Sequence, residues 1–177
     1  MKLQRTIICL AGTVLVLALL CPLALSAQRR NAPDAAVRVV KSFYRFHLSH
    51  NMNFTARNIR LRRRWFTPEL YGLLLYEMKR QDEHAKTNPD DVPYYNGDPF
   101  TTSQVYPDWF SVGQSSFDDD TAKVKVNFFW GKRGAVEDER AIEIVLTRRG
   151  GRWLIGDLID MEGSKLRDEL RREKFLP

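Results

Sequence analysis

Apolar residues recur every three or four positions in the segment that follows residue 33. Four of them have the spacing of a single helix face: Val37, Val40, Tyr44 and Leu48. Pro33 and Asp34 suit a first helical turn, because proline needs no N–H partner there and a carboxylate stabilises the positive helix end. The pattern predicts a helix that begins near Asp34 and ends near Ser49.

A second helix has a clearer beginning at Thr67-Pro-Glu69. This tripeptide supplies a capping side chain, a proline in the first turn and an acidic residue near the positive end. Apolar residues then continue at helical spacing: Leu70, Leu73, Leu74 and Met78. We expect this helix to end in the polar residues Lys86 to Asn88, before Pro89.

Two later segments alternate between apolar and polar residues, which is the period of a half-buried strand. The first runs from Thr121 to Trp130 and aligns Val124, Val126, Phe128 and Trp130. The second runs from Ala141 to Thr147 and aligns Ile142, Ile144 and Leu146. A charged, looser connection from Gly131 to Arg140 is expected between them.

Gly150-Gly151 predicts a two-residue hairpin into a third strand, Arg152 to Asp160. Val105 to Gln114 is a candidate for one more strand at an edge of the sheet. A short surface helix is expected from Lys165 to Lys174, where only Leu166 and Leu170 are apolar. Together the elements predict an α+β fold, in which N-terminal helices pack on a curved, cone-like antiparallel sheet and a short helix ends the chain.

The first 27 residues have the character of a secretory signal peptide. Lys2 and Arg5 precede the apolar run from Ile7 to Leu20, and small residues lead to Ala27. An uncleaved membrane anchor through residues 6–27 is the alternative, because that stretch is just long enough to span a bilayer. The first reading predicts an exported protein, periplasmic or extracellular, in which residues 28–177 form a single domain.

Cysteine and charge add two constraints. Both cysteines, Cys9 and Cys21, lie in the leader, so no disulfide is expected in the mature domain. The formal net charge is +6, and removing Lys2 and Arg5 leaves a mild excess of +4.

Much of this excess lies in one short segment, where four arginines would share a helix face: Arg57, Arg60, Arg63 and Arg64. This face could contact anionic lipid or another polyanion. The favoured interpretation is a solvated face whose side-chain stems cover apolar surface. A nucleic-acid partner is not expected for an exported protein.

Four motifs resemble those of a known fold family: Phe43-Tyr44 at the end of the first helix, Thr67-Pro-Glu-Leu70, Gly97-Asp-Pro-Phe100 with Gln104, and Gly151-Arg-Trp-Leu-Ile-Gly-Asp157. With the order of elements, they resemble the nuclear-transport-factor-two-like cone shared with ketosteroid isomerase and limonene-epoxide hydrolase. More narrowly, they look like an uncharacterised bacterial family of exported domains of unknown function. The resemblance implies a fold and an envelope address but no agreed activity.

Asp157 is the candidate for catalysis. It shares a strand face with Trp153, Ile155 and Ile159, and an acid among apolar neighbours could serve as a base beside a tyrosine such as Tyr44. The favoured alternative is a structural role, in which the carboxylate accepts hydrogen bonds from a loop backbone.

The stretch from Asp91 to Gln104 is either an elaborate corner or the mouth of a ligand site. Asn96-Gly97 and Asp98-Pro99 are turn dipeptides, which favours the corner. Aromatic faces beside fixed polar groups are also the mixture that ligand sites use. The ligand-binding candidates are Tyr44, Tyr94, Tyr95, Asp98, Gln104, Trp130 and Asp157.

Metal and cofactor sites have little support. His47 and His50 could face one way, but only His84 is left to join them, so we expect solvated histidines at helix ends. Asp118-Asp-Asp120 lacks the glycine and distal glutamate of a calcium loop and is expected at a charged hairpin tip. We therefore expect no metal and no cofactor.

Three functions remain open from the sequence. The first is a non-enzymatic exported module that binds a small ligand or a protein, with a homodimer through outward aromatics such as Phe129 as one form. The second is a small-molecule isomerase or hydratase that uses Asp157 with a tyrosine. The third is an inhibitor or immunity-type partner of an envelope enzyme.

Overall fold

The computed structural model of the chain describes residues 34–91 and 97–174. From Ala35 onward the described residues belong to one compact unit. The predicted leader, residues 1–27, lies outside the described residues, and so do Tyr94 and Tyr95. Signal-peptide cleavage and a role for these two tyrosines therefore stay predictions.

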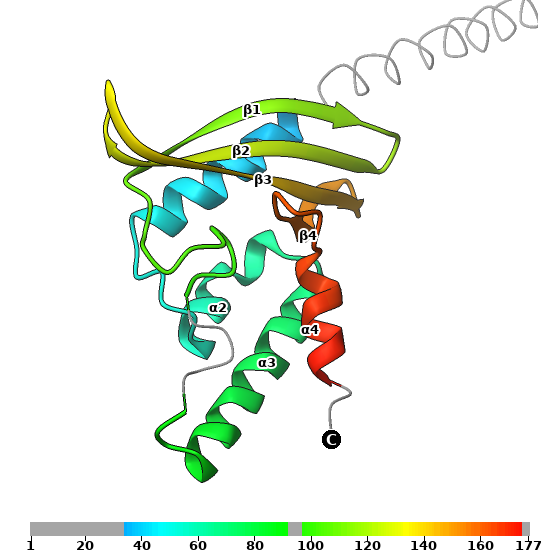
Figure 1. Cartoon of the computed structure of the whole chain (residues 1–177). Coiled ribbons are helices and arrows are strands. Elements are labelled where there is room, and N and C mark those ends of the chain that lie inside the picture. Colours follow the sequence, from blue (N-terminus) through cyan, green and yellow to red (C-terminus); the bar gives the residue numbers. More distant parts are fainter. Residues whose placement is uncertain (1–33, 92–96, 175–177) are drawn as a thin grey trace, which may run out of the picture. The chain divides into compact units, whose positions relative to one another are not determined.

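Four antiparallel strands form an open sheet in the order in which they occur along the chain (Figure 1). They are β1 (Trp109–Phe117), β2 (Thr121–Lys132), β3 (Ala135–Arg149) and β4 (Arg152–Ile159). The inner face carries the alternating apolar residues, with Val124, Phe128 and Ile144 fully buried. The predicted α+β class is confirmed, and the further edge strand is present, although it runs from Trp109 to Phe117 and not from Val105 to Gln114.

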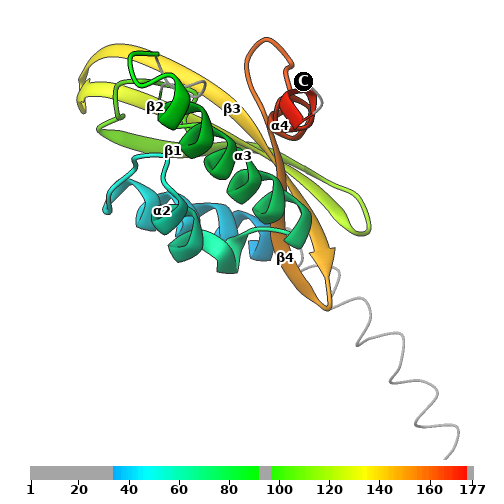
Figure 2. The same cartoon turned by 90° about the horizontal axis from the view of Figure 1, so that it is seen from below.

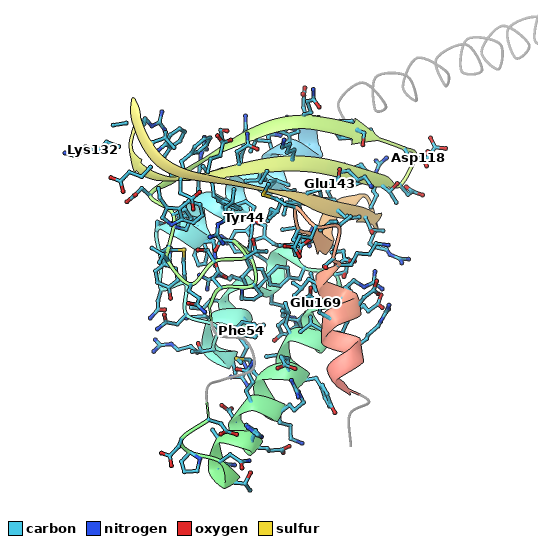
Figure 3. The ribbon with its side chains drawn as sticks, viewed as in Figure 1. Tyr44, Phe54, Asp118, Lys132, Glu143 and Glu169 are labelled. Atoms are coloured by element: carbon cyan, nitrogen blue, oxygen red, sulfur yellow. The ribbon has the colours of Figure 1, made fainter. Side chains whose placement is uncertain are left out.

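The connection predicted from Gly131 to Arg140 is wrong, because most of it is strand. β2 continues to Lys132 and β3 begins at Ala135, so the turn consists of only two residues, and Phe129 pairs with Glu139. The charged residues of β3 tolerate this conformation because they are exposed at the far end of the hairpin, where no face needs to be apolar. Figure 3 shows the two ends of β2, near Lys132 and Asp118, at opposite ends of the sheet.

The helices lie on one face of the sheet (Figures 1 and 2). The first covers residues 34–48, α3 spans Pro68–Thr87 and α4 spans Leu166–Lys174, so all three predicted helices are present. Thr67 caps α3 as expected, with its hydroxyl accepting from the backbone N–H of Leu70 at 3.3 Å. An additional short helix, α2 (Ala56–Arg62), is followed by a 3-10 turn, η1 (Arg63–Trp65).

Side chains fill the space between the helices and the sheet. Phe43 and Tyr44 from the first helix are fully buried, and the rings of Tyr44 and Phe128 lie 5.0 Å apart. The rings of Phe66 and Phe100 stack at 5.3 Å beside them. The concave side of the sheet is therefore a packed aromatic core in this part of the molecule.

Within residues 34–91 and 97–174, no helix combines the length and apolar character that a membrane span requires.

Candidate functional site

A cleft of about 720 Å³ lies on the described surface, outside the aromatic core. Three parts of the fold form its walls: the loop of residues 97–105, the part of the β2–β3 hairpin nearest its turn, and the segment that joins β4 to α4. Gln104 and Val105 line it from the loop, Trp130 and Arg140 from the hairpin, and Leu166 from α4. The cleft thus collects polar, aromatic and apolar groups from distant parts of the sequence.

A buried chain of three polar side chains fixes the loop. Nε2 of His47 lies 2.7 Å from Oδ2 of Asp98, and Nε of Arg62 donates to Nδ1 of His47 at 2.8 Å. Because arginine can only donate, Nδ1 of His47 is the acceptor and Nε2 carries the proton that it donates to Asp98. All three residues are at most 2% exposed. The first helix, α2 and the loop are therefore held together by one hydrogen-bonded network.

Asp98 also organises the turn on its own side. Its carboxylate accepts from the backbone N–H of Phe100 at 3.1 Å and from the hydroxyl of Thr101 at 2.8 Å. The N–H of Asp98 donates to the carbonyl of Ser103 at 2.9 Å. Gly97 precedes it with φ +138°, where a Cβ atom would lie 2.8 Å from the carbonyl oxygen of Ser103. Glycine is therefore required at this position.

Tyr44 supports the loop from the core. Its hydroxyl donates to the carbonyl of Phe100 at 2.8 Å. Burial, with the negative charge of Asp98 as a second cause, raises the pKa of Tyr44 well above its usual value of 10.0. The phenol therefore stays protonated and serves as a permanent donor to the loop.

The outer part of the loop is tied to the hairpin. The indole N–H of Trp130 donates to the carbonyl of Val105 at 2.9 Å, and Arg140 donates to the carbonyl of Thr102 at 3.1 Å. The guanidinium of Arg140 also lies 5.6 Å from the centre of the Trp130 ring system. These two hydrogen bonds thus hold the loop wall and the hairpin wall of the cleft in place against each other.

The structure brings some of the sequence candidates together and separates others. Asp98, Gln104 and Trp130 all line the cleft. Tyr44 lies in the core beneath the sheet, as Figure 3 shows, and reaches the loop only through its hydroxyl. Arg62 and His47, which hold the loop, were not among the sequence candidates for this site.

Asp157 is 8% exposed and acts as a hydrogen-bond acceptor for the backbone. Its Oδ1 accepts from the N–H of Leu158 at 2.9 Å and from the N–H of Arg167 at 3.0 Å. Arg167 lies in the first turn of α4, where backbone N–H groups have no partner within the helix. Both contacts are hydrogen bonds from the backbone, which is the kind of contact that the structural alternative to catalysis predicts.

The pH dependence of folding should report on Asp157. Burial raises its pKa above the ordinary 3.8, although the hydrogen bonds from Arg167 and Leu158 oppose the shift. Because the folded chain binds this proton more tightly than the unfolded chain, the stabilising contribution is complete below pH 3.8. It is lost as the pH rises through the folded pKa.

Asp157→Asn should therefore gain stability relative to the unsubstituted protein as the pH rises through this window, measured by urea unfolding at a series of pH values. Asp157→Ala should cost about 0.5–2 kcal/mol, because it leaves the N–H groups of Leu158 and Arg167 without this acceptor. Asp120→Asn, at the exposed tip of the β1–β2 hairpin, is the control. An unchanged stability difference between the asparagine variant and the parent across this range would contradict the assignment.

The charge of the cleft is predominantly negative. Among its described lining residues, four carboxylates, those of Glu137, Asp138, Asp160 and Glu169, lie near the surface with one guanidinium, that of Arg140. Asp138 takes up part of that positive charge, since its Oδ2 lies 3.6 Å from Nε of Arg140. The surface of the cleft is therefore suited to a group of positive charge.

Comparisons with known proteins identify no family. No family model matches the chain, and no curated protein matches it. Among solved structures, the crystal structure of the type VI native effector-immunity complex Tae3-Tai3 from Ralstonia pickettii contains a similar chain, with 22% identity and a TM-score of 0.47. The match covers 74% of this chain and 96% of that chain. A likeness of this extent shows neither a shared activity nor a shared partner.

The histidines differ in part from expectation. His47 is fully buried and structural, so the prediction of a solvated histidine is wrong at this position. His50 is exposed at the helix end, as expected, and His84 is exposed and pairs with Asp91 at 3.0 Å. The described residues contain no group of three or more potential ligands arranged for a metal ion.

The four predicted surface arginines, Arg57, Arg60, Arg63 and Arg64, are all exposed. Two of them cover aromatic rings: the guanidinium of Arg63 lies 5.4 Å from the ring centre of Tyr71, and that of Arg64 lies 4.0 Å from that of Trp65. These contacts fit arginine side chains that cover apolar surface. A contact with anionic lipid stays a prediction.

Proposed function

We propose that this chain is a non-enzymatic binding module that docks a protein partner in the cleft between the 97–105 loop, the β2–β3 hairpin and α4. The observation that carries the proposal is the cleft itself: an open hollow of about 720 Å³ with Trp130 at its wall and carboxylates around it. Aromatic anchors within a polar surround are characteristic of protein-recognition surfaces.

The packing of the interior supports a binding role over an isomerase or hydratase. Such an enzyme needs a carboxylate base and a neutral donor that face a common cavity. Here the contacts of the two best candidates support structural roles, because Asp157 accepts from the start of α4 and Tyr44 donates to Phe100. Aromatic side chains fill the space in which a substrate would lie.

The form of the cleft favours a protein over a small molecule. Small-molecule sites enclose most of their ligand and are lined mainly by apolar groups. This cleft is open, and although apolar residues such as Leu158 and Leu166 line part of it, four carboxylates stand around them. Its negative charge selects a partner segment that carries lysine or arginine side chains.

An inhibitor of an envelope enzyme is a specific form of this function. In that case the partner is the enzyme, and the cleft would hold a basic segment beside the enzyme's own site. The apolar leader predicted for residues 1–27 supports an exported setting.

Photo-crosslinking at single positions tests the proposal. A benzophenone side chain at Gln104 should give one discrete protein adduct in an envelope fraction of the native host, because this side chain is exposed at the cleft. The same side chain at Asp119, at the opposite end of the sheet, is the matched control. Glu137→Lys should reduce the adduct from position 104 at least about tenfold through charge repulsion. Equal adducts from both positions, or none from position 104, would contradict the proposal.

A further inference from the structure

β1 is an edge strand with one side free of a strand partner among the described residues. Its other side pairs with β2 from Trp109 to Phe117. The opposite edge of the sheet is covered, because Phe66 bridges Ile155 and the N–H of Thr67 donates to the carbonyl of Ile155 at 2.8 Å. In an edge strand, every second residue directs its backbone N–H and C=O groups away from the sheet.

The free side of β1 faces a groove of about 530 Å³. The first helix forms the other wall with Lys41, Arg45 and Leu48, which are spaced along one helix face. Residues 109–112 of β1 form the near wall. Arg133 also lines the groove, and its guanidinium lies 5.0 Å from the centre of the Trp109 ring system. A strand edge that runs beside a helix is a geometry in which other proteins bind an extended peptide.

Edge strands usually carry features that prevent pairing with a further strand, and only one half of β1 has such a feature. The register shifts between Val112 and Ser115, and such bulges hinder further pairing. The preceding residues, Trp109 to Val112, contain no lysine, no proline and no other charged side chain. The unprotected half is the half that borders the groove.

The groove is positively charged. Lys41 and Arg45 are exposed, and neither forms an ion pair among the described residues. Arg133 adds a third positive charge to the lining of the groove. Asp108 is the one carboxylate among the described lining residues, and its Oδ2 already accepts from the N–H of Gly131 at 2.7 Å.

We propose that this groove binds an extended acidic segment of a partner protein, which adds a strand to the edge of β1 at Trp109 to Val112. Backbone hydrogen bonds to the edge supply the affinity. Alternate side chains of the segment point toward the first helix, where glutamate or aspartate meets Lys41 and Arg45 and an apolar residue meets Leu48. The site is separate from the acidic cleft and does not depend on the function proposed for it.

Charge argues against a second copy of the chain as the occupant. Two copies joined through their β1 edges would bring the basic groove of each beside that of the other. Each copy presents Lys41, Arg45 and Arg133 at this edge. Like charges brought together in this way oppose such a dimer, whereas an acidic segment neutralises them.

The probe is a synthetic octapeptide of alternating glutamate and valine, labelled with fluorescein and titrated with the full chain while the anisotropy is recorded. We expect saturable binding that weakens as salt is added. The same peptide with N-methyl groups on alternate backbone nitrogens should lose binding, because the added strand can no longer donate to the edge. An octapeptide of alternating lysine and valine should bind at least about tenfold more weakly.

Variants locate the site. Lys41→Glu and Arg45→Glu should each weaken binding of the acidic peptide several-fold, and at least about tenfold together. Lys125→Glu is the matched control, since it makes the same charge change on the exposed face of β2. In ¹⁵N spectra, the amides of Trp109 to Val112 should shift on titration.

Four results would overturn the inference: no binding of the acidic peptide, equal binding of the N-methylated or lysine peptide, an equal effect of Lys125→Glu, or a dimer in light scattering whose formation blocks the peptide. The dimer would assign the edge to a second copy.

Discussion

Arg62→Met is expected to lower the free energy of unfolding by about 3–5 kcal/mol, because it removes one member of a buried charged network and leaves the others in place. Methionine retains most of the apolar stem but none of the donors. The guanidinium donates to Nδ1 of His47 and to the carbonyls of Asn58 and Asn51 at 2.9 Å each. Burial lowers the pKa of Arg62, and the negative charge of Asp98 opposes this shift. The nearby carboxylate therefore helps to keep the buried guanidinium charged.

Urea unfolding of Arg62→Met and Arg60→Met measures the effect with a matched control. Arg60 lies on the same helix but is exposed, so its replacement should change stability by no more than about 0.5 kcal/mol. Asp98→Asn should also be destabilising, because it leaves Arg62 buried without a counter-charge. Equal stabilities of the Arg62 and Arg60 variants would show that the network contributes nothing.

Most of the strands and helices could be predicted because their patterns are local. The alternation of apolar and polar residues in β2 and β3 depends only on neighbouring residues, and so does the Thr67 cap of α3. The structure has the alternating segments and the cap at the predicted positions. The segment from Gly131 to Arg140 was predicted wrongly for a related reason. Its charged residues are typical of loops, and the strand conformation is imposed by pairing with β2 across the turn.

The candidate site was less predictable because distant contacts decide it. Arg62 stands in a run of arginines whose other members are exposed, and no composition rule separates it from them. One signal was present: Arg62 lies three residues after Ile59, so the two share a helix face, and both are buried. His47 likewise extends the spacing of Val40 and Tyr44, both of them buried. A polar residue that continues the apolar spacing of a helix can therefore belong to a buried hydrogen-bond network, and it does not always mark the point where the helix ends.

The second large predicted loss of stability comes from a substitution in the aromatic core. Phe43→Ala is expected to lower the free energy of unfolding by about 3–5 kcal/mol, through lost burial and the cavity left behind. Phe43 is fully buried, and five rings surround it with centroids 4.8 to 5.8 Å away: Tyr44, His47, Trp65, Phe66 and Phe100. The cavity would open behind Phe100, so the loop that borders the cleft should also lose order.

Thermal or urea unfolding measures the loss, with two comparison variants. Phe43→Leu should cost less, because leucine refills much of the space, and it keeps the test interpretable if the alanine variant does not fold. Leu61→Ala removes an apolar side chain that is 53% exposed and should be nearly neutral. Benzene should restore part of the stability of Phe43→Ala but not of the parent, since an apolar cavity stays dry and binds such ligands. If the parent itself gained as much from benzene, the space between the helices and the sheet would already be open, and a ligand site in that space would have to replace the cleft.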